Sequence, residues 1–522
     1  MELLSQLGTV DKKLDSIYRQ KARVCWIKHG DMNSKFFHNA IRWRRLKNEV
    51  KCVEVDSQWC EDPQLVRREA KSLFERRFLA TREVGVNLGS MEFKSLNHEV
   101  SSNMIVSFSE EEVKEVVWQC GGSKSPGPDE FNFNFIQNCW DVMKSDVMAA
   151  VNFFHAIGSF PKGCNASFIA LVPKVREPSS FDQFRPISLV GVIYKIVTKI
   201  LVCRMKKVMS LIIDDCQSAF LSDRGLMDSV VMANEVIEEI RRKRKSGICF
   251  KVDFEKVYDS VRWSFLFDML RRLGFHDKWI GWVKGCLVSS SVSVLVNGSP
   301  SEEFKPTRGL RQGDPLAPFL FLVVAEGLAG LVRQALRKDM LRGVKLGRNN
   351  IECCLLQFAD DTLFTCENSF NNIFTIKAIL RCFELVSGLK VNFLKSRLAG
   401  IDVDTFVLNT YAKTLNCNTM KIPFQYLGVE VGGNPRKKQF WEPVVKKLEA
   451  RLSSWKGRFL SMAGRICLLK SVFIFKAPTI VCSKIKSIQR KFLWDWGRQN
   501  SSISWVSWDN VCKPRGPVSE RD

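Results

Sequence analysis

Short apolar runs along the chain predict β-strands, and longer stretches with helical spacing separate them. The segment Ile248 to Phe254 is apolar enough to predict a strand buried inside a sheet. Ser291 to Val296 alternates and leads into Asn297-Gly298, which predicts a β-hairpin. Apolar residues flank Asp360-Asp361 on both sides. That pattern predicts a second hairpin, with two carboxylates at its tip.

Helical spacing is clearest in four stretches of the chain. They are residues 1–45, Ser107 to Gln119 with a Ser109 cap, Trp263 to Leu273 before Gly274, and Leu316 to Leu336. Shorter strands, such as Phe168 to Val172, fall between them without a regular βαβ alternation. The pattern therefore predicts an α+β fold.

The net charge changes this picture, because it points to a polyanionic partner. Lys and Arg number 79 against 55 Asp and Glu, a net charge of +24. Between Pro435 and Arg515 there are 18 basic and 4 acidic residues, so this segment carries more than half of the excess. Such an excess favours binding to nucleic acid or to an anionic surface. An unspecialised basic surface is the alternative.

Aromatic residues are interleaved with the basic residues of this segment. They include Phe440, Trp441, Trp455, Phe459, Trp494, Trp496, Trp505 and Trp508. Flat rings among cations suit a surface that stacks on bases. Trp is also commonly buried, so a helical bundle with a Trp core stays open as an interpretation.

Cysteine usage and hydropathy predict a soluble intracellular protein, with nucleus and cytoplasm not distinguished. The 18 cysteines form no Cys-x-x-Cys pair and there are 5 His, so no zinc-finger spacing occurs. Free thiols are typical of a reducing compartment. The longest apolar run, Leu316 to Ala325, ends at Glu326 and is shorter than the roughly 20 residues that cross a membrane. No membrane partner is expected.

The acidic pair gains meaning from a lone acid upstream. Asp253 lies at the end of the strand predicted from Ile248, and Asp360 and Asp361 lie at the tip of the second predicted hairpin. Adjacent carboxylates repel each other, and a divalent cation removes that cost. Three acids on neighbouring strands can therefore hold the metal pair of phosphoryl transfer. Ordinary turn chemistry is the alternative for an isolated Asp-Asp pair.

These acids belong to an ordered set of motifs. In this set the chain resembles the reverse transcriptases of LINE-type (non-LTR) retrotransposons, in their plant form, over nearly its whole length. The matching motifs are Lys124-Ser125-Pro126-Gly127-Pro128-Asp129, Arg185-Pro186-Ile187-Ser188-Leu189, Gln217-Ser218-Ala219-Phe220, Lys251-Val252-Asp253-Phe254-Glu255-Lys256-Val257-Tyr258-Asp259, Gly309-Leu310-Arg311-Gln312-Gly313-Asp314-Pro315-Leu316-Ala317-Pro318, Phe358-Ala359-Asp360-Asp361, Tyr426-Leu427-Gly428 and Trp455-Lys456-Gly457-Arg458-Phe459-Leu460-Ser461.

The resemblance implies a right-hand polymerase fold, with fingers, a palm built on an antiparallel sheet, and a helical thumb. Residues 1–105 are then a helical N-terminal extension or linker. Residues 106–420 are fingers and palm. Residues 421–522 are a basic helical thumb or connection region that ends early.

It also implies a two-metal active site. Asp253 and Asp360 would ligate two Mg²⁺ ions, or Mn²⁺ as an alternative, with Asp361 assisting and a carbonyl near Phe254 completing the shell. One metal would activate the primer 3′-hydroxyl and the other would steady the leaving pyrophosphate.

Three basic residues are implied at the phosphates of the nucleotide. Lys174 and Arg185 would grip the triphosphate, because Arg suits bidentate phosphate contacts. Lys395 would donate a proton to pyrophosphate. For all three, an ordinary exposed basic side chain is the alternative.

The remaining implied contacts concern the sugar and base of the nucleotide. The Tyr258 ring would clash with a 2′-hydroxyl and so select deoxynucleotides. A core aromatic is the alternative for Tyr258. Gln312 and Gly313 would line the pocket, the glycine allowing close backbone approach.

The chain departs from the family pattern in several places. Glu130 stands where the family usually has Gly, which predicts a strained turn, and Val257 replaces a usual Ala beside Tyr258. The segment Asp223 to Asp228 is a loose version of its family counterpart. Neither an endonuclease nor a ribonuclease H domain is recognisable, so we expect an incomplete element.

The sequence therefore predicts an RNA-directed DNA polymerase that extends a DNA primer on an RNA template with deoxynucleoside triphosphates. The alternative is a catalytically inactive nucleic-acid-binding remnant of such an element. An RNA-directed RNA polymerase is disfavoured for two reasons. Tyr258 would exclude a ribose, and Ala359 precedes the Asp pair where such a polymerase would be expected to have Gly. The sequence leaves the oligomeric state and the preferred template undefined.

Overall fold

The structure is a computed structural model. It describes residues 42, 46, 48–50, 52–55, 58–80, 88–122, 124–433, 438–452 and 479–494. They belong to two compact units, Arg45–Gly432 and a smaller one drawn from Met1–Arg44 and Gly433–Asp522. Most of the helix expected over residues 1–45 lies outside the described residues. So do the Trp455 to Ser461 motif and most aromatics of the basic segment.

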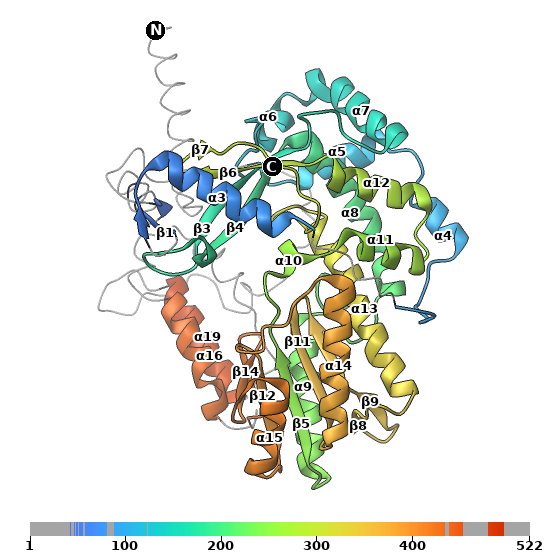
Figure 1. The fold of residues 1–522 in the computed structure, drawn as a ribbon, viewed down its shortest axis with the longest axis vertical. Coiled ribbons are helices and arrows are strands. Elements are labelled where there is room, and N and C mark those ends of the chain that lie inside the picture. Colours follow the sequence, from blue (N-terminus) through green and yellow to red (C-terminus); the bar gives the residue numbers. More distant parts are fainter. Residues whose placement is uncertain are drawn as a thin grey trace. The chain divides into compact units, whose positions relative to one another are not determined.

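The helices of the larger unit lie mainly around two sheets (Figure 1). They are α3 (Pro63–Phe78), α4 (His98–Asn103), α5 (Glu110–Gln119), α6 (Phe133–Asn138), α7 (Trp140–Ile157), η1 (Phe181–Gln183), α8 (Val192–Ile212), α9 (Leu226–Arg242), α10 (Val257–Ser260), α11 (Trp263–Arg272), α12 (Asp277–Val288), α13 (Ala317–Arg337), α14 (Phe370–Ser387) and α15 (Thr405–Leu415).

The strands of this unit are short, which fits the short apolar runs of the sequence. They are β1 (Val53–Val55), β2 (Gln58–Cys60), β3 (Ala166–Pro173), β4 (Phe184–Val190), β5 (Gly247–Val252), β6 (Ser291–Val296), β7 (Ser299–Pro300), β8 (Val344–Leu346), β9 (Ile351–Cys353), β10 (Leu355–Phe358), β11 (Asp361–Glu367), β12 (Arg397–Ile401), β13 (Asn418–Thr419), β14 (Phe424–Tyr426) and β15 (Val429–Val431). Helices and mostly antiparallel strands occur together, which confirms the predicted α+β class.

The larger sheet has the order β10-β11-β5-β12-β13. Strand β5 is central and antiparallel to both β11 and β12, and only the β12–β13 pair is parallel. Both faces of β5 are buried, because Ile248 and Phe250 enter one hydrophobic core and Cys249 enters another. The mostly apolar segment from Ile248 therefore did predict a central strand.

Each face of this sheet is covered by its own set of elements. One core joins the sheet to α11, α13, α14 and α15, and the other joins it to α9, β14 and β15. This sandwich fixes the strand ends, where the predicted acids lie.

The second sheet has the order β4-β3-β6-β7 and carries α3 on one face. Val66, Ala70 and Phe74 repeat along the buried side of α3 and pack in one core with Ile169 of β3 and Val294 of β6. This packing brings α3 into contact with α10.

Local sequence signals were reliable for several elements. Ser109 caps α5 and its side chain accepts a hydrogen bond from the Glu112 amide at 3.2 Å. The β6–β7 hairpin turns at Asn297 and Gly298, which both have positive φ. Gly274 follows α11 with φ of 79°. All three were predicted.

Helix α13 is the one described helix that is long and apolar enough to cross a membrane. However, 78% of its apolar window is buried inside the protein, as is typical of a core helix. Its buried Glu326 forms an ion pair with Arg333 at 2.9 Å.

The smaller unit contains α16 (Lys438–Arg451) and α19 (Thr479–Trp494), which contact each other. Trp441 and Leu448 of α16 and Leu452 after it are buried. Lys484 of α19 lies 3.8 Å from Glu449 of α16.

Candidate active site

The three predicted acids lie at one end of the larger sheet. Asp253 directly follows β5, and Asp361 is the first residue of β11. Because Thr362 pairs with Val252 in an antiparallel register, the next step along both strands sets Asp361 beside Asp253. Asp360 occupies the two-residue turn between the paired residues Phe358 and Asp361. The predicted hairpin is confirmed.

The acids influence each other's protonation. Burial is the largest cause that raises the pKa of each of the three carboxyl groups. Asp360 further raises the pKa of Asp253, Asp361 that of Asp360, and Asp253 that of Asp361. Lys395 acts oppositely on Asp253, and Lys251 on Asp361. A divalent cation would relieve this accumulation of negative charge.

The acids form an open array rather than a closed metal cage. Within the described part of the chain, no three His, Cys, Asp or Glu side chains converge closely enough to hold a metal by themselves. Mg²⁺ is commonly held by one or two carboxylates together with substrate phosphates and water. The donor set at this sheet end fits that kind of ion.

The turn that carries Asp360 is held by a side chain from a distant segment. Ala359 has a left-handed backbone, with φ of 54°. The Oε1 atom of Gln217 accepts a hydrogen bond from the Ala359 amide at 2.9 Å, and its Nε2 donates to the Ala359 carbonyl at 3.4 Å. Gln217 is 2% exposed. The sequence motif pointed to Gln217 through the family resemblance, but this supporting role was not predicted.

A loop near residue 392 supports the other acid. The Asn392 amide donates to the Asp253 carbonyl at 2.8 Å, and the Asp253 amide donates to Ser396 Oγ at 3.1 Å. Phe254 pairs with Val391 through an isolated bridge. This loop also carries Lys395, which explains why the charge of Lys395 acts on Asp253.

Tyr258 lies between the acids and the Gly-rich turn. Its carbonyl accepts a hydrogen bond from the Leu310 amide at 2.6 Å. Its ring packs against Phe321, with the ring centroids 5.6 Å apart. Burial and the charge of Asp360 raise the pKa of Tyr258 to about 12. The phenol is therefore neutral at physiological pH.

The Gly-rich turn itself packs on strand β4. The Ser188 amide donates to the Gln312 carbonyl at 2.7 Å. Gly313 has φ of 105°, and a Cβ atom there would lie 3.0 Å from the Ser188 carbonyl oxygen. The close approach that this glycine permits is therefore to β4, which joins the turn to the second sheet.

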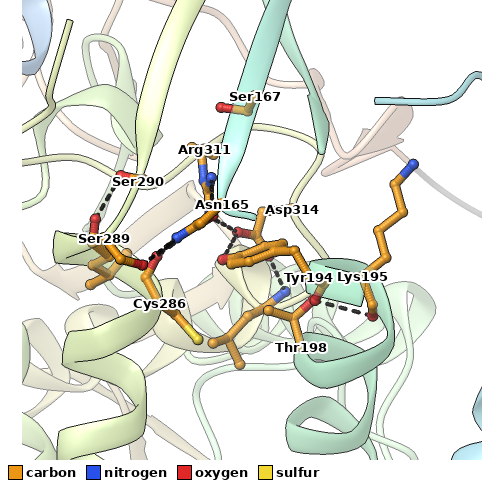
Figure 2. Close-up of polar contacts among 12 residues, drawn as sticks. Asn165, Ser167, Tyr194, Lys195, Thr198, Cys286, Ser289, Ser290, Arg311 and Asp314 are labelled. Carbon is orange, nitrogen blue, oxygen red and sulfur yellow. Dashed lines mark hydrogen bonds and ion pairs between the residues drawn. The ribbon is translucent and has the colours of Figure 1, made fainter. Parts of the chain in front are cut away.

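A buried polar network lies under this turn (Figure 2). Arg311 and Asp314 form an ion pair at 3.3 Å, and both side chains are 5% exposed. Tyr194 donates to Asp314 at 2.6 Å, and Arg311 donates to Asn165 Oδ1 at 2.8 Å while its guanidinium stacks over the Tyr194 ring. Asn165 in turn donates to the Cys286 carbonyl at 2.8 Å. The network fixes the residues on either side of Gln312 and Gly313.

Lys174 and Arg185 lie at the end of β3 and the start of β4. Both are exposed, and Arg185 pairs in register with Val172. Burial is the largest cause that lowers the pKa of Lys174, and the charges of Arg77, Arg185 and Lys395 add to it. The predicted basic residues therefore lie within electrostatic range of one another. Arg77 was not predicted.

The family model described as reverse transcriptase (RNA-dependent DNA polymerase) matches residues 172–431, about half of the chain. The Transposon TX1 uncharacterized 149 kDa protein of Xenopus laevis is 25% identical over 491 residues, which cover 89% of this chain and 36% of that protein. The Pol polyprotein of the type-2 retrotransposable element R2DM of Drosophila melanogaster is 27% identical over 279 residues, with coverages of 53% and 25%.

The chain thus spans about a third or less of the length of these relatives. Among solved structures, telomerase from Candida tropicalis, in complex with a telomeric RNA fragment, matches with a TM-score of 0.39 and 11% identity, covering 69% of this chain and 59% of that one. At this TM-score the likeness carries no functional argument. Every predicted site residue lies inside the range matched by the family model.

Proposed function

This chain belongs, through residues 172–431, to the reverse transcriptases of non-LTR retrotransposons, and on that premise we propose that it polymerises DNA on an RNA template. Its substrates are then an RNA template, a DNA primer and deoxynucleoside triphosphates. The observation that carries the proposal is the meeting of Asp253, Asp360 and Asp361 at one sheet end.

The α+β fold of the larger unit is the right-hand polymerase fold, and its five-stranded sheet is the palm. We assign residues 106–420 to fingers and palm, residues 421–522 to a basic thumb or connection region, and residues 1–105 to an N-terminal extension. The protein acts inside the cell, where a reducing environment keeps thiols free.

We assign the metal site to Asp253 and Asp360, with Asp361 and the Phe254 carbonyl beside them. Two Mg²⁺ ions bound there would neutralise the charge that develops on the reacting oxygens. The protein's own contribution is to hold the acids in place through Gln217 and Ser396, so that little reorganisation is needed during the reaction.

The other predicted residues position the nucleotide. Lys174 and Arg185 supply positive charge for the triphosphate, and Lys395 lies at the acids as a proton donor to the leaving pyrophosphate. The Tyr258 ring excludes a 2′-hydroxyl, and the turn with Gln312 and Gly313 closes the pocket. The ring of Tyr258 acts through its bulk, since its hydroxyl stays protonated.

Primer extension tests the proposal. The chain is supplied with poly(rA)/oligo(dT), dTTP and Mg²⁺, next to the variant Asp360→Ala. We expect extension by the wild type and a loss of about a thousandfold or more in the variant, because a removed ligand costs several kcal/mol of barrier. Extension at the same low level by the wild type and by Asp360→Ala would reject the proposal. Salt-sensitive duplex binding without extension would identify an inactive nucleic-acid-binding remnant.

A further inference from the structure

Asp182 is the meeting point of three basic side chains from three different elements. It lies in η1, at the tip between β3 and β4. Its Oδ1 atom is 2.5 Å from Arg77 Nη2 and 2.8 Å from Lys256 Nζ. Lys174 Nζ donates to the Asp182 carbonyl oxygen at 3.0 Å. The Asp182 carboxylate thus serves cations from α3 and from the segment after Asp253, and its backbone carbonyl serves the lysine that follows β3.

Three cations, Arg77, Lys174 and Lys256, gather here against two carboxyl groups, Asp182 and the buried Asp259, and the charges of all three act to lower the pKa of each against the effect of burial. Both Arg77 and Lys256 bind the same oxygen of Asp182, so the carboxylate satisfies only part of their donor capacity. Arg77 is 9% exposed, and its buried Nε has no hydrogen-bond partner among the described residues. A guanidinium has five N–H donors. The cluster could therefore accept an anion with more oxygens than a carboxylate.

The cluster adjoins the nucleotide site assigned above. Lys256 is three residues beyond Asp253, and Lys174 and Arg185 are the residues assigned to the triphosphate. Besides burial, the charges of Arg77, Arg185 and Lys395 all act on Lys174 and lower its pKa. An anion bound between Arg77 and Lys256 is thus close to the path of the phosphates.

Arg77 is fixed more firmly than Asp182. The Arg77 carbonyl accepts from Arg308 Nε at 2.8 Å, and the neighbouring Phe78 carbonyl accepts from the Thr307 amide at 2.8 Å. The Arg77 guanidinium lies 4.7 Å from the centroid of the Phe74 ring. The Asp182 side chain, in contrast, is 58% exposed. Separation of the pair would therefore move Asp182 and leave Arg77 in place.

We propose that Arg77 and Lys256 bind phosphate oxygens of the incoming nucleotide, and that Asp182 occupies this position until the triphosphate displaces it. The inference rests on the proposed polymerase function and adds two phosphate-binding residues and one internal competitor to it. No covalent step is involved, because the exchange replaces one set of ion pairs with another. Phosphate binds these cations better than a carboxylate, since it offers more charge and more acceptor oxygens.

The test uses inorganic tripolyphosphate, titrated calorimetrically into the protein without nucleic acid or Mg²⁺, and the KM for dTTP in primer extension. Asp182→Asn keeps the shape of the side chain and removes its charge. We expect tighter tripolyphosphate binding and a lower KM, each by about twofold to fivefold, the effect of one partly exposed ion pair. Arg77→Gln and Lys256→Gln should each weaken tripolyphosphate binding by about tenfold and raise the KM for dTTP by about tenfold, as expected for the loss of a charge-assisted hydrogen bond.

Arg76→Gln is the matched control. Arg76 neighbours Arg77 on the same helix, but its Nε donates at 3.3 Å to the Ser72 carbonyl of that helix. Its removal should leave both measurements unchanged. Because Arg77 is buried, the folding of each variant is checked by a thermal melt. If Arg77→Gln does not fold, Lys256→Gln tests the proposal, since the Lys256 side chain is half-exposed.

The outcomes separate the two proposals. Unchanged or weaker tripolyphosphate binding in Asp182→Asn overturns the inference, as does a Lys256→Gln variant that behaves like Arg76→Gln. If primers are extended normally but the Asp182, Arg77 and Lys256 variants do not change tripolyphosphate binding in the expected directions, the inference alone fails. If the variants change tripolyphosphate binding as expected but no primer is extended, the anion site stands and the polymerase function fails.

Discussion

Gln217 holds both polar backbone groups of Ala359, the residue that precedes the catalytic pair. The two residues are 142 positions apart, and the Gln217 carboxamide accepts from the Ala359 amide and donates to its carbonyl. A left-handed alanine is disfavoured by roughly 1 kcal/mol or more, and it persists only where neighbours enforce it. Gln217 is thus the side chain that keeps Asp360 in its turn.

We predict that Gln217→Leu lowers kcat in primer extension by about tenfold to a hundredfold, because a displaced Asp360 stabilises the transition state less well. The KM for dTTP should change little, since the Gln217 side chain bonds Ala359 and Ala219 and none of the residues assigned to the triphosphate. Gln217→Glu is the conservative partner variant. It keeps the acceptor for the Ala359 amide and should restore part of kcat, whereas equal losses in both variants would contradict this role.

Glu130 offers a test of stored backbone strain. It has φ of 59°, as predicted from its place where the family usually has glycine. Glu130→Gly should raise the free energy of unfolding by about 1 kcal/mol, because glycine adopts this conformation without the steric cost. Glu130→Ala retains the Cβ atom and should gain nothing. Chemical denaturation of both variants measures the difference, and a gain in the alanine variant would point to charge instead.

Tyr258 should govern the choice of sugar. Tyr258→Ala is expected to reduce the preference for dTTP over UTP, measured as a ratio of kcat/KM values, by about tenfold or more, because the steric clash with the 2′-hydroxyl is removed. Tyr258→Phe keeps the ring and should keep the preference. If the phenylalanine variant loses selectivity as well, the hydroxyl and not the bulk of the ring would be responsible.

The buried pair under the Gly-rich turn should matter for folding. Arg311→Met leaves Asp314 without its cation and should lower the free energy of unfolding by about 3–5 kcal/mol, the usual cost of breaking a buried ion pair. The exposed pair Arg342–Asp339 has the same spacing along the chain and serves as the control. Arg342→Gln should leave the denaturation midpoint unchanged. Similar losses in both would show that burial is not the cause.

Sequence patterns predicted the elements of this fold well where local chemistry decides them. The cap at Ser109, the turn at Asn297-Gly298 and the Asp360-Asp361 hairpin are each set by a few neighbouring residues. The predicted acids do come together, because each lies at a strand end and the register aligns those ends.

The contacts that the sequence did not predict join residues that are far apart in the chain. Arg77 meets Asp182 across 105 positions, and Gln217 meets Ala359 across 142. Such pairs depend on how α3 and the segment before α9 pack on the sheets, and no local pattern encodes that packing. Gln217 stood within a recognisable motif, but nothing in the motif indicated which backbone it would bind.

The segment that carries Gln217 also covers an edge of the larger sheet. Strand β10 is one of the two outer strands of the larger sheet. The Gln357 amide donates to the Cys216 carbonyl at 2.7 Å, and the Gln357 carbonyl accepts from the Ser218 amide at 3.0 Å. Unpaired outer strands are templates on which further chains add. Substitutions that loosen this segment are therefore expected to reduce the soluble yield as well as the activity, so the Gln217 variants should be compared at equal concentrations of folded protein.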